Sequence, residues 1–398
     1  MAGKPRPGSR SWRGLPTDEN GQDRIDRKVA AQTIKRREDR GREPRPNADD
    51  SGAKETIRLL QNEIGNLRKM ALDHRAIREE VLKIAHAKPP VPGWLIAPGA
   101  KARRGPGVPS LFLSDLHWGE VVKASEIGGV NSYDLKTAHA RLRVVINGAV
   151  ELLTRHMVNP SYPGIVMILG GDMLSGNIHD ELKSTNAQEV MPCLLDLFGA
   201  MIWAIEAMAD QFGAVFLPCV TGNHGRNTLK IQAKERHHTN FDWLLYQLLD
   251  RHFAKDKRVT FLIPDGPDAL FKVFGHSYLL THGDQFRGGD GMIGALGPII
   301  RGDHKKRSRN AQIGQEYDTL LLGHWHQLIQ MQRLVVNGSL CGYNEYANQG
   351  NFGFEPPRQA LWITHPERGI TFQMPVQASE PTKSSTRGTD WVSVPRIA

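Results

Sequence analysis

Asp115 and His117 stand two positions apart at the end of an apolar run, residues 111–117, which reads Leu-Phe-Leu-Ser-Asp-Leu-His. A carboxylate and an imidazole at this spacing, at the end of a strand, can bind one cation from the same side. The pair is frequent by chance, so by itself it is only a weak predictor of a metal site.

Four further apolar runs end in the same kinds of side chain. Residues 166–172 end in Gly-Asp, 214–224 in Gly-Asn-His, 277–284 in His-Gly-Asp and 319–326 in Gly-His-Trp-His. Buried parallel strands read as continuous apolar runs, and α/β sites form where their carboxyl ends meet. We therefore expect one convergent site and not five unrelated polar groups of a core. The predicted metal ligands are Asp115, His117, Asp172, Asn223, His282, His324 and His326.

The elements that must position these ligands alternate between strands and helices in the first half of this region. Apolar residues at helical spacing predict helices at 133–156, 188–211 and 240–253, and closely spaced strands follow within 259–281. An order that is α/β first and β-rich later is typical of two packed sheets flanked by helices.

The ordered set D-x-H, G-D, G-N-H, H and G-H-x-H resembles the calcineurin-like metallophosphoesterase superfamily over residues 110–376. The resemblance implies an α/β fold, a four-layer α-β-β-α sandwich. The Mre11/SbcD-like nucleases and the metallophosphoesterases of bacteriophages are the branches that we expect to be most similar.

The resemblance also implies two divalent metal ions that share Asp172. Asp115, His117 and His326 would complete the first site, and Asn223, His282 and His324 the second. A carboxylate suits the bridging position because it has two anionic oxygens to share. This mixture of nitrogen and oxygen ligands suits Mn²⁺, Zn²⁺ or Fe²⁺ and does not single one out. We expect Mn²⁺, with Zn²⁺, Fe²⁺ and Mg²⁺ as alternatives.

His224 follows the ligand Asn223, and in the family this histidine donates a proton to the phosphate or to the leaving oxygen. Many members carry an acidic residue immediately afterwards, whereas this chain has Gly225 and Arg226. The carboxylate that orients His224 is then expected to be Asp284 or Asp180, or to be absent. Arg226 becomes a candidate for binding a phosphate.

Other side chains near the ligands have two interpretations each. His179 is either a second proton donor or phosphodiester contact, or part of a helix N-terminus that carries Asn177 and Asp180. Trp118 and Trp325 adjoin ligands, and they either stack on a base or wall off the metal site.

Charge is distributed unevenly along the 398 residues. Residues 1–110 hold 24 Lys and Arg against 14 Asp and Glu, while the remainder holds 27 against 28. A basic extension on a near-neutral domain indicates contact with a polyanion, or a solvated tail. Residues 301–309 form the densest basic run of the catalytic part, either a loop at the rim of the site or a solvated helix.

Composition divides the chain into five parts. These are a basic, mostly disordered extension (1–54), a long amphipathic helix (55–88), a linker (89–109), the catalytic domain (110–376) and a polar tail (377–398). The helix at 55–88 either packs on the catalytic domain or joins a homodimer. No apolar run suggests a membrane span or a secretory signal, and three cysteines in apolar runs suggest a reduced, cytoplasmic compartment.

These observations predict a two-metal phosphoesterase that hydrolyses phosphodiester bonds, and we expect it to be a DNA or RNA nuclease. One alternative is a phosphatase or a phosphodiesterase for cyclic nucleotides or other small molecules. Another is a nucleic-acid-binding accessory subunit with a vestigial site, which the filled ligand positions disfavour.

Overall fold

The computed structural model describes residues 107–379 apart from 159 and 289–293, together with five isolated positions: Arg58, Gln61, Asn62, Pro92 and Leu95. The predicted extension, amphipathic helix, linker and tail lie largely outside these residues. All the elements below belong to one compact unit, Ala85–Ala398.

The strands form two mixed sheets. The first has the order β11-β10-β1-β2-β3-β4, with β1 to β4 parallel and β10 and β11 antiparallel. Its strands are β1 (Val108–Leu113), β2 (Ile165–Leu169), β3 (Val215–Pro218), β4 (Val259–Leu262), β10 (Arg358–His365) and β11 (Gly369–Gln377).

The second sheet has the order β5-β6-β7-β9-β8, and its central strands β6, β7 and β9 are parallel. Its strands are β5 (Asp268–Val273), β6 (His276–Thr281), β7 (Thr319–Leu322), β8 (Ile329–Met331) and β9 (Leu334–Val336).

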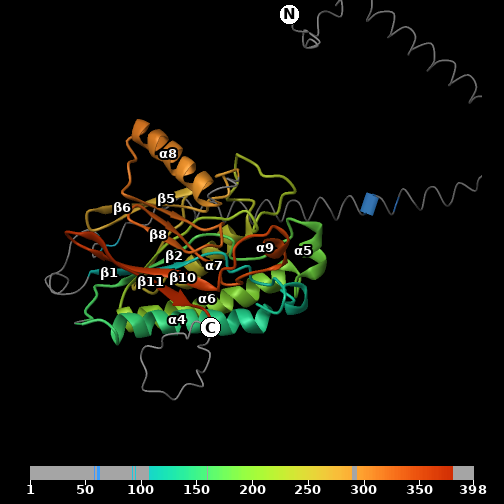
Figure 1. Ribbon diagram of the computed structural model, residues 1–398, viewed down its shortest axis with the longest axis horizontal. Helices are drawn as coiled ribbons and strands as arrows, with labels where there is room; N and C mark the ends of the chain where they lie inside the picture. Colours follow the sequence, from blue (N-terminus) through green and yellow to red (C-terminus); the bar gives the residue numbers. More distant parts are fainter. Residues whose placement is uncertain are drawn as a thin grey trace, which may run out of the picture. The chain divides into compact units, whose positions relative to one another are not determined.

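The two sheets are stacked and helices cover their outer faces, as Figure 1 shows. Helices α4 (Leu135–Thr154), α6 (Val190–Phe212) and α7 (Phe241–His252) pack on the first sheet, and α8 (Leu296–Gln312) packs on the second. The expected α-β-β-α sandwich is confirmed. The short elements η2 (Ala124–Glu126), α5 (Asp180–Thr185) and α9 (Glu345–Gln349) lie in connecting loops.

Strands β1 and β7 read as continuous apolar runs because both of their faces are buried. In β1, Leu111 and Leu113 pack towards the helices, while Phe112 enters the core between the sheets. In β7, Leu321 faces that same inner core and Leu320 faces α8. Successive side chains of a strand point to opposite faces, so a strand between two layers needs apolar residues at every position.

The three predicted helices are present, with ends set by local capping. Asp134 accepts the Thr137 N–H at the start of α4, and Asn240 accepts the Asp242 N–H at the start of α7. Helix α6 ends where Gly213 takes a left-handed conformation.

Helix α6 is long and apolar enough to cross a membrane by length and composition alone. It packs against α4, α7 and β3, and one side of it, including Leu197, Met201 and Ile205, is fully buried in the core. Burial of this side therefore accounts for part of the apolar composition, while Leu195 and Trp203 on the helix are exposed.

Two expectations from the sequence need correction. The basic run 301–309 is not a loop, because it lies within α8. Leu95, in the predicted linker, is fully buried in the core between the sheets, and its carbonyl accepts the Phe274 N–H at 2.7 Å.

Candidate metal centre

The predicted ligands all follow the carboxyl ends of strands. Asp115 comes after β1, Asp172 after β2, Asn223 after β3, His282 after β6 and His324 after β7. Because the parallel strands of both sheets end at the same edge of the sandwich, these segments meet there.

The backbone at this edge is strained in a consistent way. In the described part of the chain eight residues other than glycine have positive φ, and five of them are predicted ligands. These are Asp115 (53°), His117 (46°), Asp172 (49°), His324 (68°) and His326 (53°). Each such conformation costs on the order of 1–3 kcal/mol and persists only when its surroundings impose it, typically at functional sites.

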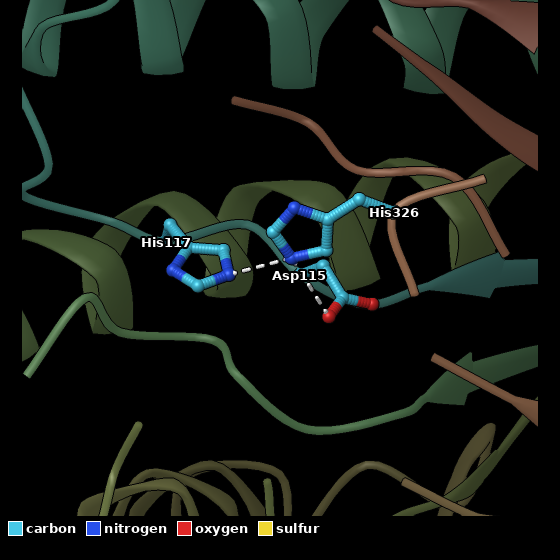
Figure 2. A group of neighbouring side chains, drawn as sticks. All are labelled: Asp115, His117 and His326. Carbon is cyan, nitrogen blue, oxygen red and sulfur yellow. Dashed lines mark hydrogen bonds and ion pairs between the residues drawn. The ribbon is translucent and has the colours of Figure 1, made fainter. Parts of the chain in front are cut away.

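The first group of ligands consists of Asp115, His117 and His326, which come from β1 and β7 (Figure 2). His117 Nε2 lies 3.0 Å from His326 Nε2, and His326 Nε2 lies 3.4 Å from Asp115 Oδ1. Asp115 Oδ1 also accepts the His324 N–H at 2.8 Å, which ties the ends of the two sheets together.

The second group consists of Asp172, His282 and His324. His282 Nε2 lies 2.9 Å from Asp172 Oδ2, and on its other side His282 Nδ1 lies 2.8 Å from the carbonyl oxygen of Gly170. A carbonyl can only accept, so Nδ1 carries a proton and Nε2 faces the carboxylate. A second hydrogen bond of this kind fixes the tautomer and orientation of histidines that bind metals.

A third group joins the other two. His117, Asp172 and His224 also have ligand atoms within 4.8 Å of one another. Asn223 precedes His224, and its side-chain oxygen is buried without a hydrogen-bond partner in the described structure. Asp172 thus belongs to two groups, as a bridging carboxylate requires.

The donor set fits divalent cations. Two atoms that each lie about 2.1 Å from one octahedrally coordinated ion are about 3 Å apart. The N–N separation of 3.0 Å and the N–O separations of 2.9 and 3.4 Å within the two groups are near this value. The unpartnered oxygen of Asn223 is a further donor of the right type.

Glycines allow the strand ends to approach this closely. A Cβ at Gly222 would collide with the Asp172 carboxylate, and a Cβ at Gly323 would collide with the carboxylate of Asp115. Packing therefore requires glycine at positions 222 and 323.

Burial and mutual charge determine the protonation of the group in the absence of metal. Burial lowers the pKa of His282, but the Asp172 carboxylate outweighs this and raises the pKa to about 10. Burial lowers the pKa of His324 to about 4, and the charge of His282 acts in the same direction. Burial, with the neighbouring His224 and His326, also holds the pKa of His117 well below its ordinary value.

Asp242 supports the centre and was missed by sequence reasoning. This fully buried carboxylate accepts backbone N–H groups of Asp172 at 3.0 Å, Met173 at 3.3 Å and Gly222 at 2.9 Å. It thereby holds together the loops after β2 and β3. Its position in the first turn of α7 gave no signal of this role.

A second missed carboxylate lies behind His117. Glu120 Oε2 is 3.4 Å from His117 Nδ1, and Glu120 Oε1 accepts the Asn344 side-chain N–H at 2.8 Å. Burial raises the pKa of this carboxyl group. The spacing of three residues from a ligand histidine was the one sequence signal for this pairing.

His224 is oriented by the backbone and not by a carboxylate. Its Nδ1 lies 2.8 Å from the carbonyl oxygen of Ser175, so Nδ1 is the protonated nitrogen and Nε2 is left available. Of the three alternatives from the sequence, the described structure agrees with the absence of an orienting carboxylate and not with Asp284 or Asp180. Asp284 pairs with Arg236 at 2.8 Å, and the exposed Asp180 pairs with Lys183 at 2.8 Å.

The other candidates lie around His224. The exposed His179 is the N-cap residue of α5, without a side-chain capping bond, and its ring lies 6.3 Å from that of His224. Arg226 donates to the carbonyls of Thr228 and Asn223 and lines a narrow cavity with Asn223 and Arg236.

The two tryptophans differ in their surroundings. Trp118 is 1% exposed and donates its indole N–H to Asp196 at 2.7 Å, so it is a core residue and cannot stack on a base. Trp325 is half-buried and its ring lies 5.8 Å from that of His324, and its indole nitrogen is buried without an acceptor in the described structure.

No protein-family profile and no curated protein matches this sequence. Among solved structures, it is similar to a predicted phosphoesterase from Streptococcus pneumoniae TIGR4 (9% identity, 68% of this chain and 97% of that chain, TM-score 0.26). It is also similar to a single mutant of Vps29 from Entamoeba histolytica (12% identity, 68% and 99%, TM-score 0.27). Neither of these neighbours is described as a nuclease.

Proposed function

We propose that this protein is a two-metal phosphodiesterase. The observation that carries the proposal is the pair of ligand groups joined at Asp172, with the unpartnered oxygen of Asn223 beside it. Metal-assisted phosphoester hydrolysis uses two adjacent cation sites with histidine, carboxylate and amide ligands.

In this proposal Asp115, His117 and His326 hold one divalent cation, Asn223, His282 and His324 hold the other, and Asp172 is shared. We propose Mn²⁺ as the preferred ion, with Zn²⁺, Fe²⁺ or Mg²⁺ as substitutes. Bound cations supply Lewis acidity, which polarises the phosphoryl group and acidifies water.

The residues of the chain supply the proton and the orientation. His224 with both ring nitrogens protonated donates the Nε2 proton to the leaving oxygen and becomes the neutral ring that keeps its Nδ1 proton. The Ser175 carbonyl holds Nδ1 and fixes the direction of the ring. The exposed His179, whose ring is 6.3 Å away, is a second contact for the substrate. Arg226 and Arg236 place positive charge in the cavity beside Asn223, where a phosphate oxygen can be bound.

We propose nucleic acid as the substrate, DNA or RNA. The basic extension supports this choice, and so does α8, which is inserted between the ligand strands β6 and β7. The main alternative is a phosphatase or a phosphodiesterase for small molecules. An accessory subunit with a vestigial site is disfavoured because every ligand position is filled.

One assay separates these alternatives. The purified protein is incubated with Mn²⁺ and, in turn, bis-p-nitrophenyl phosphate, p-nitrophenyl phosphate, a cyclic nucleotide, and labelled single- and double-stranded DNA and RNA. Hydrolysis of the diester and of at least one polynucleotide supports the proposal. Preference for the monoester or the cyclic nucleotide selects the main alternative, and absence of all hydrolysis with bound metal selects the accessory subunit.

The N-terminal segments are predicted to add affinity for nucleic acid, and 55–88 to pack on the domain or to form a homodimer. A truncation that tests this should end at residue 88, because Leu95 belongs to the core. Weaker DNA binding with unchanged diester hydrolysis is expected. We further propose a cytoplasmic location, since Cys193, Cys219 and Cys341 are all buried and free.

A further inference from the structure

A second cavity lies beside the metal centre, between α8 and the segment that follows His282. Its volume is about 280 Å³, and it is lined by Phe286 and five cationic side chains: Arg287, Arg301, Lys305, Lys306 and Arg309. Among the described residues that line it, none is acidic. A cavity of this composition suits an anionic ligand.

The cations are arranged along one face of α8. Arg301, Lys305 and Arg309 are four residues apart, so they occupy the same side of the helix. Like charges at this spacing repel one another and destabilise a helix. On another side of the same helix, Arg307 is paired with Asp303 at 2.8 Å. The repulsion on the cavity side therefore has no compensating acidic residue within α8.

Packing fixes the shape of the cavity. A Cβ at Gly302 would collide with the ring of Phe286, so glycine at this position allows the segment after His282 to rest directly on α8. Lys306 is 7% exposed and is held by Asp268 at 2.7 Å, with its ammonium 5.8 Å from the centre of the Phe286 ring. Asp268 also pairs with Arg309 at 2.9 Å.

Two of the cations are not neutralised by any contact in the described structure. Arg287 and Lys305 are exposed and neither forms an ion pair with a described residue. They are therefore the side chains that a bound anion would engage without having to break an existing pair.

The cavity is connected to the metal centre through few residues. Lys306 Nζ lies 3.3 Å from Thr281 Oγ1, and Thr281 immediately precedes the ligand His282. In the orientation that gives the Gln285 amide hydrogen-bond partners, its side-chain oxygen accepts from Lys306 Nζ at 2.9 Å and its side-chain N–H donates to Asp284 Oδ1 at 3.1 Å. Asp284 in turn pairs with Arg236, which lines the narrow cavity beside Asn223. Hydrogen bonds and an ion pair thus connect Lys306 on α8 with residues next to the ligand His282 and with Arg236.

We propose that this cavity, named here the α8 subsite, binds the phosphates of a nucleic-acid strand on one side of the bond to be cleaved. The inference rests on the proposed phosphodiesterase function and specifies where a polymeric substrate is held. A mononucleotide or free phosphate offers the same chemistry, but neither can occupy the α8 subsite and the metal centre through a continuous chain.

The test replaces the two unpaired cations. The double variant Arg287→Gln, Lys305→Gln removes two positive charges, breaks no ion pair between described residues, and keeps a good helix former at 305. The matched control is Arg251→Gln, Lys255→Gln, which removes two exposed charges at the distal end of α7. Both are compared with the wild type in three measurements.

The measurements are KM and kcat for a labelled oligonucleotide, the salt dependence of its equilibrium binding, and hydrolysis of bis-p-nitrophenyl phosphate. Loss of two phosphate contacts should weaken oligonucleotide binding on the order of tenfold at 0.1 M salt. It should also reduce the slope of log K against log salt by about 1.4. Hydrolysis of the small diester should be unchanged, and the control variant should behave as the wild type does.

An oligonucleotide affinity and salt slope equal to those of the wild type would overturn the α8 subsite, as would an equal loss in the control variant. Inorganic phosphate and a mononucleotide are also tested as inhibitors of the wild type and the double variant. If the double variant loses as much affinity for either of them as it loses for the oligonucleotide, the cavity would be reassigned to a small ligand. If the wild type hydrolyses the small diester but binds no oligonucleotide, the subsite fails and the proposed function stands. If the wild type hydrolyses no diester, the proposed function fails, and the binding measurement still decides whether the α8 subsite holds nucleic acid.

Discussion

Asp242 Oδ2 accepts the backbone N–H of Asp172 at a distance of 3.0 Å. The same oxygen accepts the Gly222 N–H at 2.9 Å, and Asp242 Oδ1 accepts the Met173 N–H at 3.3 Å. One buried side chain on α7 therefore fixes the backbone at Asp172 and the loop that carries Asn223. Removing it should disturb the metal centre without removing a single ligand.

We expect Asp242→Ala to destabilise the protein and to weaken its affinity for divalent metal. It leaves three buried N–H groups without an acceptor, at about 1–3 kcal/mol each, so a loss of about 3 kcal/mol or more in the free energy of unfolding is expected. Asp242→Asn retains one acceptor oxygen and should be intermediate. Denaturant unfolding and metal titration of the two variants test this order, and equal metal affinity in the wild type and Asp242→Ala would refute the supporting role.

The ligand-bearing strands were predictable because the signal is local. A strand buried on both faces needs an apolar side chain at each position, so Leu111, Leu113 and their counterparts in β7 predict strands. The polar residues that follow each strand predict where the edge of the sheet lies. The stacking of two such sheets was predicted from the order of the strands and helices along the chain.

The supporting contacts were not predictable because they join distant segments through the backbone. Asp242 reaches N–H groups 70 and 20 residues away, and any peptide could supply them. The carbonyl that orients His224 belongs to the backbone of Ser175, and every residue has a carbonyl, so the residue type at 175 does not predict this contact. Trp118 adjoins a ligand in sequence, but the direction of its side chain into the core depends on α6, where Asp196 accepts its indole N–H.

Replacement of the shared carboxylate tests the two-metal arrangement. We expect Asp172→Ala to lose both metal ions and all hydrolysis of bis-p-nitrophenyl phosphate, because Asp172 belongs to the second ligand group and is also grouped with His117 of the first. Elemental analysis after removal of free Mn²⁺ gives the stoichiometry. The comparison variant His326→Ala removes a ligand from the first group alone and should retain one ion. Two ions bound to Asp172→Ala would show that this residue is not the bridge.

Replacement of His224 tests its assignment as the proton donor. His224→Ala should keep the metal content of the wild type and lose roughly 10²–10⁴-fold in kcat on a diester with an alkyl leaving group. The loss should be smaller with bis-p-nitrophenyl phosphate, because p-nitrophenolate leaves without needing a proton. The backbone bond from His224 N–H to Asp172 Oδ1, at 2.6 Å, is retained in the variant. A variant that loses metal would instead make His224 a ligand, as its grouping with His117 and Asp172 allows.

Metal uptake should release a proton near neutral pH. In the metal-free protein the Asp172 carboxylate opposes the effect of burial and raises the pKa of His282 to about 10, so His282 is protonated at pH 7. Its Nδ1 proton is retained by the Gly170 carbonyl at 2.8 Å, so a cation bound at Nε2 must displace the other proton. Calorimetric titration with Mn²⁺ at pH 7, in two buffers with different enthalpies of ionisation, should give about one proton released from this site.

The same pair predicts how the stability of the metal-free protein depends on pH. The pKa of His282 is raised on folding, so the stabilisation from its bond to Asp172 is fully present below the unfolded pKa of about 6.5 and is lost as pH rises through about 10. The melting temperature without metal should therefore fall across this interval, and the fall should be smaller in His282→Asn. Saturating Mn²⁺ should remove most of the difference, since the cation then takes the place of the proton. Two results together would place the second site away from His282. The melting temperature without metal would change equally little with pH in the wild type and in His282→Asn, and Mn²⁺ binding would release no proton.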